Sequence, residues 1–195
     1  MGIEDNKERI LKLLYDTNRE GMNYLVEYMD ETRFFTTKCS RKHHLAVRGG
    51  LATHSLHVYD NFSHKNDKWN LNIPKDSVVI MSILHDICKL EDNEDKSKHG
   101  SRSIEILGRF IELTLEEKMV IKYHMGLFSV FGYEEFTAHE IHQAISIHPS
   151  VQIFASSDME CSVYEDGGKV PEQFKEIETD VKSALAEIQE ELLGG

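Results

Sequence analysis

"SVVIMSILHDICKL", residues 77–90, places a histidine and an aspartate side by side in a stretch that otherwise resembles a protein interior. Apolar side chains cover most of the circumference of a helix built from this stretch, namely Val78, Val79, Met81, Ile83 and Leu84. We therefore expect a helix that is buried on nearly all sides. An ionised carboxylate at Asp86 needs compensation there, and the usual partners are a hydrogen-bonded cation or a metal ion.

Helical periodicity continues along the rest of the chain, and no stretch shows the strict alternation of a β-strand. Helices are expected at residues 4–17, 21–30, 51–65, 74–90, 100–111, 113–125, 138–147, 149–162 and 171–193. Pro74 suits the first turn of a helix, and Thr114 and Glu117 have the spacing of a capping box. The sequence thus predicts an all-α fold, a compact single-domain helical bundle.

The length of 195 residues suits one domain that spans residues 1–195. N-terminal helices are expected within residues 1–42, and an amphipathic C-terminal helix at residues 171–193. That last helix carries apolar residues at spacings of three and four. Such a stripe docks on the chain's own core or, in a second interpretation, across a homodimer interface.

Composition narrows the class of protein. No apolar run approaches the length of about 18 residues that a membrane span needs, and the charged N-terminus differs from a signal peptide, so we expect a cytoplasmic protein without a membrane partner. A net charge of −12 disfavours long nucleic acid. Residues 32–59 nevertheless contain no acid and several lysines and arginines, which suits a small anionic ligand. Three widely spaced cysteines indicate reduced thiols and argue against a zinc–thiolate site.

Polar residues in apolar surroundings form a candidate metal site. His85 and Asp86 can reach one point from neighbouring rows of their helix, and Lys89 follows on the same side. His54 lies among apolar neighbours in "GGLATHSLHV", and Asp158 ends the apolar run "VQIFASSD". Two imidazoles and two carboxylates from three helices would form a cage for a divalent ion. Nitrogen and oxygen ligands without thiolate suit Mn, Fe, Co, Ni or Zn, and Mg is also considered.

The order His54, then His85-Asp86, then Asp158 resembles the H…HD…D signature of the HD-domain metal-dependent phosphohydrolases. The resemblance covers residues 43–162, an HD-like metal-binding core. "HHLAVRGGLATHSLHV" is similar to the HD module of certain bacterial 3′→5′ exoribonucleases, and "HDICK" fits an HD-x-x-K variant of the motif. The resemblance implies a compact all-helical domain.

The resemblance also implies two further ligands, His99 and His124, in which case Asp86 would bridge two metals. The alternative for these residues is structural, with His99 capping a helix and His124 satisfied in the core. Four other histidines are interpreted as surface or helix-end residues, namely His57, His139, His142 and His148.

The functional hypothesis is hydrolysis of a phosphate ester or anhydride in a nucleotide or related small substrate by a metal-activated water. Asp86 would hold the metal and orient the water, and Lys89 would stabilise charge on the phosphoryl group. Candidates to bind further phosphates are Arg48, Lys42 and Arg102. Two alternatives stay open: a noncatalytic nucleotide- or metal-binding module, and an HD-type two-iron oxygenase.

Overall fold

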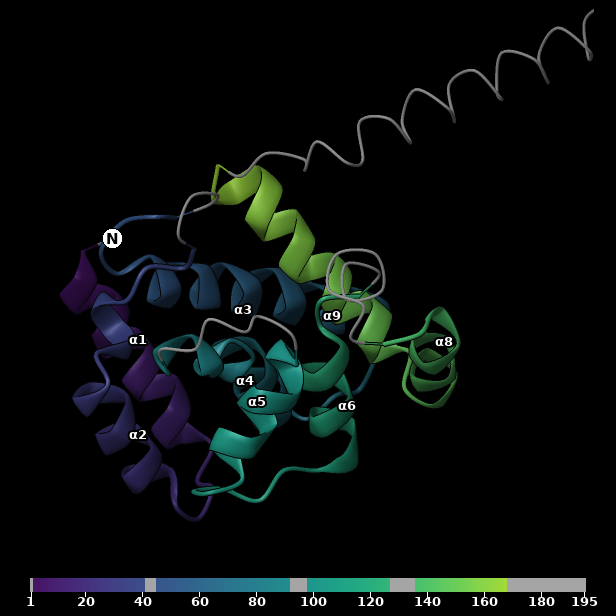
Figure 1. Cartoon of the computed structure of the whole chain (residues 1–195), viewed down its shortest axis with the longest axis horizontal. Helices are drawn as coiled ribbons and strands as arrows, with labels where there is room; N and C mark the ends of the chain where they lie inside the picture. The colour runs from purple at the N-terminus through teal and green to yellow at the C-terminus, as the bar shows by residue number, and fades with distance from the viewer. Residues whose placement is uncertain (1, 41–44, 92–97, 127–135, 168–195) are drawn as a thin grey trace, which may run out of the picture.

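The computed structural model describes residues 2–40, 45–91, 98–126 and 136–167. Within these ranges the chain forms eight α-helices and no strand, which confirms the predicted all-α bundle (Figure 1). The α-helices are α1 (Ile3–Asp16), α2 (Met22–Glu31), α3 (Gly50–Trp69), α4 (Lys75–Leu84), α5 (His99–Leu107), α6 (Leu115–Tyr123), α8 (Ala138–Ile147) and α9 (Ser150–Glu160). Short 3₁₀ turns occupy Phe34–Thr36 and Ile87–Leu90, and a π-helix at Cys161–Glu165 follows α9. None of the described helices has both the length and the apolarity to cross a lipid bilayer.

Helix α4 is the centre of the bundle, as its sequence predicts. Every residue from Ser77 to Leu84 is buried. The helix packs against α1, α3 and α6, so that its whole circumference meets protein. In Figure 1, α1 and α2 lie at one side of the molecule and α8 at the other, with α4 between them.

The N-terminal helices are connected to the centre of the bundle by a partly buried ion cluster. Arg19, in the turn between α1 and α2, donates to Asp76 at 2.8 Å and also contacts both carboxylate oxygens of Glu117. Glu117 is fully buried and also completes the predicted capping box with Thr114 at the start of α6. One guanidinium therefore joins the first two helices to α4 and α6.

Helix α3, expected to end at residue 65, runs on to Trp69, and two other helices end at least four residues earlier than the sequence predicts. The fourth, expected to run to Leu90, ends at Leu84, because Asp86 has φ −104° and ψ 15° and the chain continues as a 3₁₀ turn. The fifth, expected to run to residue 111, ends at Leu107 and is followed by Gly108. The expected C-terminal helix, residues 171–193, lies outside the described residues.

A glycine lets α5 approach the end of α6 closely. A Cβ atom added to Gly100 would lie 2.3 Å from the carbonyl oxygen of Lys122 and 2.4 Å from that of Ile121. The contact places His99, the first residue of α5, beside His124, with ring centroids 5.4 Å apart. Only glycine permits this approach without displacing the backbone.

Candidate metal centre

The structure brings together all six residues that the sequence proposes as metal ligands. They come from α3, the end of α4, the start of α5, the end of α6 and α9, and they are His54, His85, Asp86, His99, His124 and Asp158. Among them are two groups whose ligand atoms all lie within 4.8 Å of one another, His54–His85–Asp158 and His85–Asp86–His124. The cluster could therefore hold a metal ion.

Helix ends orient two of the histidines. His85 is the C-terminal cap of α4, and His124 is that of α6. The last carbonyl groups of a helix have no partner within the helix, so a nearby donor can use them. The Nδ1 atom of His85 donates to the carbonyl oxygen of Ser82 at 3.0 Å, and that of His124 to the carbonyl oxygen of Ile121 at 2.7 Å. Since a carbonyl only accepts, each neutral ring must carry its proton on Nδ1 and a lone pair on Nε2.

Both Nε2 atoms are buried and face carboxylate oxygens without a hydrogen bond among the described residues. The Nε2 atom of His85 lies 3.5 Å from Asp86 and 3.8 Å from Asp158, and that of His124 lies 3.5 Å from Asp86. A lone pair aimed at an anionic oxygen leaves the imidazole nitrogen unsatisfied, at a cost typical of buried polar atoms. A cation between the nitrogen and the carboxylate would satisfy the lone pair, so the donor set fits a metal.

Burial and neighbouring charges shift the pKa values of the candidate ligands in both directions. Burial lowers the pKa of His85 to about 3, and it also lowers the pKa of His99, so both rings are neutral near pH 7. Burial alone would raise the pKa of Asp86, but Lys89 and the surrounding histidines outweigh it and hold this pKa well below its usual value. For His124, burial alone would lower the pKa, but the nearby carboxylates of Asp86 and Asp158 outweigh burial and raise it.

Lys89 is held on Asp86 by the 3₁₀ turn. Its ammonium group bonds one carboxylate oxygen of Asp86, while His99 Nε2 contacts the other oxygen. Burial opposes the charge on Lys89, but the neighbouring carboxylate outweighs burial and raises the pKa of the ammonium above its usual value. Lys89 is thus a permanent cation at the edge of the cluster.

Two cysteine thiols lie beside the cluster, although the sequence predicts a site without thiolate ligands. Cys39 lies 3.6 Å from the Nζ atom of Lys89 and belongs to a group of potential ligands with His54 and Asp86. Cys88 lies 3.2 Å from Nδ1 of His99. Burial raises the pKa of Cys88 to about 12, so without a metal it is a neutral thiol. All three cysteines are free, as predicted. Two of their sulfur atoms nevertheless lie among the potential ligands, whereas the predicted ligands were nitrogen and oxygen atoms alone.

Asp166 and His57 are also part of the centre, and the sequence analysis missed both roles. The carboxylate of Asp166 bridges Nδ1 of His54 and Nδ1 of His57, each at 2.6 Å. His57, interpreted from the sequence as a surface or helix-end histidine, has a partly exposed side chain, and its ring also contacts Asp166. The usable signal was an acid eight residues after Asp158, about two helical turns further along the chain.

The expected phosphate-binding residues are only partly placed. Arg48 is exposed, just before the start of α3 at Gly50. Arg102 projects from α5 and lies 3.9 Å from Glu91. Lys42 lies outside the described residues.

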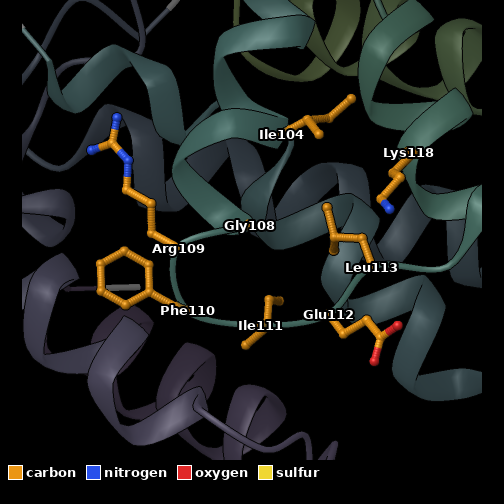
Figure 2. Close-up of a pocket in the computed structure, with 8 residues that line it drawn as sticks. All are labelled: Ile104, Gly108, Arg109, Phe110, Ile111, Glu112, Leu113 and Lys118. Atoms are coloured by element: carbon orange, nitrogen blue, oxygen red, sulfur yellow. The ribbon is translucent and has the colours of Figure 1, made fainter.

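A cavity of about 400 Å³ lies apart from the cluster. The loop from Gly108 to Leu113 forms its wall, with Arg109 and Phe110 on one side and Lys118 on another (Figure 2). None of the candidate metal ligands lines it, so it is not a substrate cavity for this centre.

Comparisons with family models, with curated proteins and with solved structures give no match to this chain, and its centre is interpreted from its own geometry.

Proposed function

We propose that this chain is a metal-dependent phosphohydrolase that acts on a nucleotide or a related small phosphate ester or anhydride. The observation that carries the proposal is the pair of buried Nε2 lone pairs, on His85 and His124, that face Asp86 and Asp158 beside the cation of Lys89. The resemblance of the ligand order to the HD signature supports the same assignment.

The resemblance to the HD signature implies two sets of ligands that share Asp86. His54, His85 and Asp158 would hold one ion together with Asp86, and His99 and His124 would hold a second with the other oxygen of Asp86. A divalent ion in such a set lowers the pKa of a coordinated water and withdraws charge from a phosphoryl oxygen. The nitrogen and oxygen donors favour Mn, Fe, Co, Ni or Zn, and Mg belongs in the same trial.

Lys89 would act on the substrate through its charge. Because its pKa is raised, it stays protonated near pH 7 and cannot serve as a general base. Its role is to stabilise negative charge on the transferred phosphoryl group, while its bond to Asp86 holds it in place.

A basic segment next to the centre would bind the remaining phosphates. Cys39, whose thiol lies within reach of Asp86 and His54, is preceded by the exposed Lys38. The backbone N–H of Cys39 donates to the carbonyl oxygen of Leu45, which keeps this segment close to Arg48 and the start of α3. Lysine and arginine on one side of an acidic protein attract a small anion rather than a long one.

The test combines metal analysis with a hydrolysis screen. Untagged protein is analysed for metal, then stripped, reloaded with Mn, Fe, Co, Ni, Zn or Mg, and assayed for phosphate release from nucleotides and phosphate esters. Lys89→Met should retain the metal and lose roughly 10²–10³-fold in turnover, the range for removal of one transition-state donor. Asp86→Ala should lose both metal and activity, whereas His142→Gln, at an exposed position of α8, should lose neither.

Two other outcomes would replace the proposal. Uptake of two irons per chain with consumption of dioxygen and no phosphate release would identify an oxygenase. Stoichiometric nucleotide binding without turnover under any metal would identify a noncatalytic binding module.

A further inference from the structure

Three of the candidate ligand histidines, His54, His85 and His124, obtain their orientation in two different ways. His85 and His124 stand at helix ends and donate from Nδ1 to a free carbonyl of their own last turn. His54 lies inside α3, where the carbonyl oxygens of the backbone are engaged by the helix itself. Its Nδ1 atom therefore needs an acceptor from elsewhere in the chain.

Asp166 supplies that acceptor from 112 residues away. Its side chain is completely buried, and its Oδ2 atom lies 2.6 Å from Nδ1 of His54. On the opposite side of the ring, Nε2 of His54 lies 2.9 Å from Asp158, at the position where a metal would be shared. A proton held on Nδ1 by Asp166 leaves the Nε2 lone pair for the metal.

The π-helix after α9 sets the place of Asp166. The backbone N–H of Asp166 donates to the carbonyl oxygen of Cys161 at 2.9 Å, five residues back, and this bond closes the wide turn at Cys161–Glu165. Such turns insert an extra residue into a helix and recur at functional sites. Here the turn lets α9 contribute Asp158 on one side of His54 and lets its continuation contribute Asp166 on the other.

His57 fixes the rotation of the carboxylate. It lies one helical turn after His54 on α3, and its Nδ1 atom is 2.6 Å from Oδ1 of Asp166. Each oxygen of Asp166 is thus bonded by a different imidazole of the same helix. A carboxylate held at both oxygens cannot turn away from His54.

We propose that Asp166, held by His57, is a positioning residue that fixes the Nδ1–H tautomer of His54 and thereby sets the affinity of the centre for its metal. This role rests on the proposed metal centre but not on the nature of the reaction. Removal of an outer carboxylate partner of a metal-bound histidine typically weakens metal binding 10–100-fold.

The experiment measures zinc affinity of the full, metal-stripped chain by competition with a chromophoric chelator. Asp166→Asn keeps the size of the side chain but offers a single acceptor oxygen to two imidazole N–H groups, and we expect roughly 10–100-fold weaker binding. Asp67→Asn, the same change at an exposed position of α3, is the matched control and should bind zinc as the unmodified chain does. His57→Gln should fall between the two.

A second measurement does not depend on the folding of any variant. In the zinc-loaded, ¹⁵N-histidine-labelled chain, long-range ¹H–¹⁵N spectra should show His54 with its proton on Nδ1 and its Nε2 atom bound to metal. A proton on Nε2 of His54 would overturn the inference, as would a folded Asp166→Asn protein with unchanged zinc affinity. Absence of zinc uptake by the unmodified chain would overturn this role and the proposed function together, whereas zinc uptake without hydrolysis would overturn only the latter.

Discussion

Replacement of His85 by glutamine should abolish most of the thermal stabilisation that metal gives to this protein. His85 is completely buried, and its Nε2 atom meets two carboxylates without a hydrogen bond among the described residues. A ligand at a thousandfold excess over its Kd stabilises the folded state by about 4 kcal/mol. For a chain of 195 residues, each kcal/mol moves the Tm by about 2–4 °C, so saturating zinc should raise the Tm by roughly 8–16 °C.

Loss of one ligand that weakens binding a hundredfold would remove about 2.8 kcal/mol of this gain, or roughly 6–11 °C. The assay is thermal unfolding of the metal-stripped protein across a zinc titration, with each variant compared with its own metal-free Tm. His142→Gln, on the exposed side of α8, should show the full rise. An equal rise in His85→Gln, or no rise in the unmodified chain, would refute the reasoning from the unsatisfied Nε2 atoms.

Three further predictions concern the titration of His85, the ion cluster of Arg19 and the contact between α5 and α6. The pKa of His85 falls from 6.5 to about 3 on folding. Between these two pH values the unfolded chain binds a proton at this residue and the folded chain does not, so the folded state loses stability as the pH falls from 6.5 to about 3. The slope of unfolding free energy against pH, from urea titrations between pH 3 and 6.5, should drop by about 1.4 kcal/mol per pH unit in His85→Gln, and an unchanged slope would contradict the neutral state of the ring. Glu117→Gln should lower the free energy of unfolding, measured in urea, by roughly 2 kcal/mol, because Arg19 loses a buried charged partner. Glu112→Gln, a change on the surface, should lower it little. Gly100→Ala should lower the free energy of unfolding by about 1–3 kcal/mol and weaken zinc binding, because the added Cβ would press on the carbonyl group that orients His124. Gly108→Ala, in which the nearest contact of the added Cβ would be 3.2 Å, should leave zinc binding intact. Equal zinc affinities of the two variants would argue against a site that depends on the close approach of α5 and α6.

Local patterns in the sequence were sufficient to predict the existence and approximate position of most of the helices. Residues 138–147 form a helix as expected, and the sixth helix has its predicted cap at Thr114. The ends of the fourth and fifth helices were wrong, because the backbone of Asp86 and the residues after Gly108 follow tertiary packing rather than periodicity. Apolar periodicity reports which face is buried and does not report where a buried helix stops.

Some of the candidate ligands could be proposed from the sequence because a charged or polar residue in an apolar run is anomalous within its own segment, whereas His99 and His124 were proposed only from the family resemblance. Asp86 and Asp158 were visible in that way. Asp166 was not, since its neighbours are polar and its partner His54 lies more than a hundred residues earlier. The thiols of Cys39 and Cys88 were missed for the same reason, because only the packing of helices brings them to the ligands.

The 3₁₀ turn after α4 explains why the lysine stands three residues after the aspartate. With three residues per turn, residues i and i+3 eclipse one another, so Lys89 rises directly over Asp86. In an α-helix the same pair would be separated by about 60° around the axis, and the next residue would be a comparable neighbour. The three-residue spacing of aspartate and lysine in "HDICK" therefore matches the winding of a 3₁₀ helix. A lysine moved to the position of Leu90 would face away from the carboxylate of Asp86.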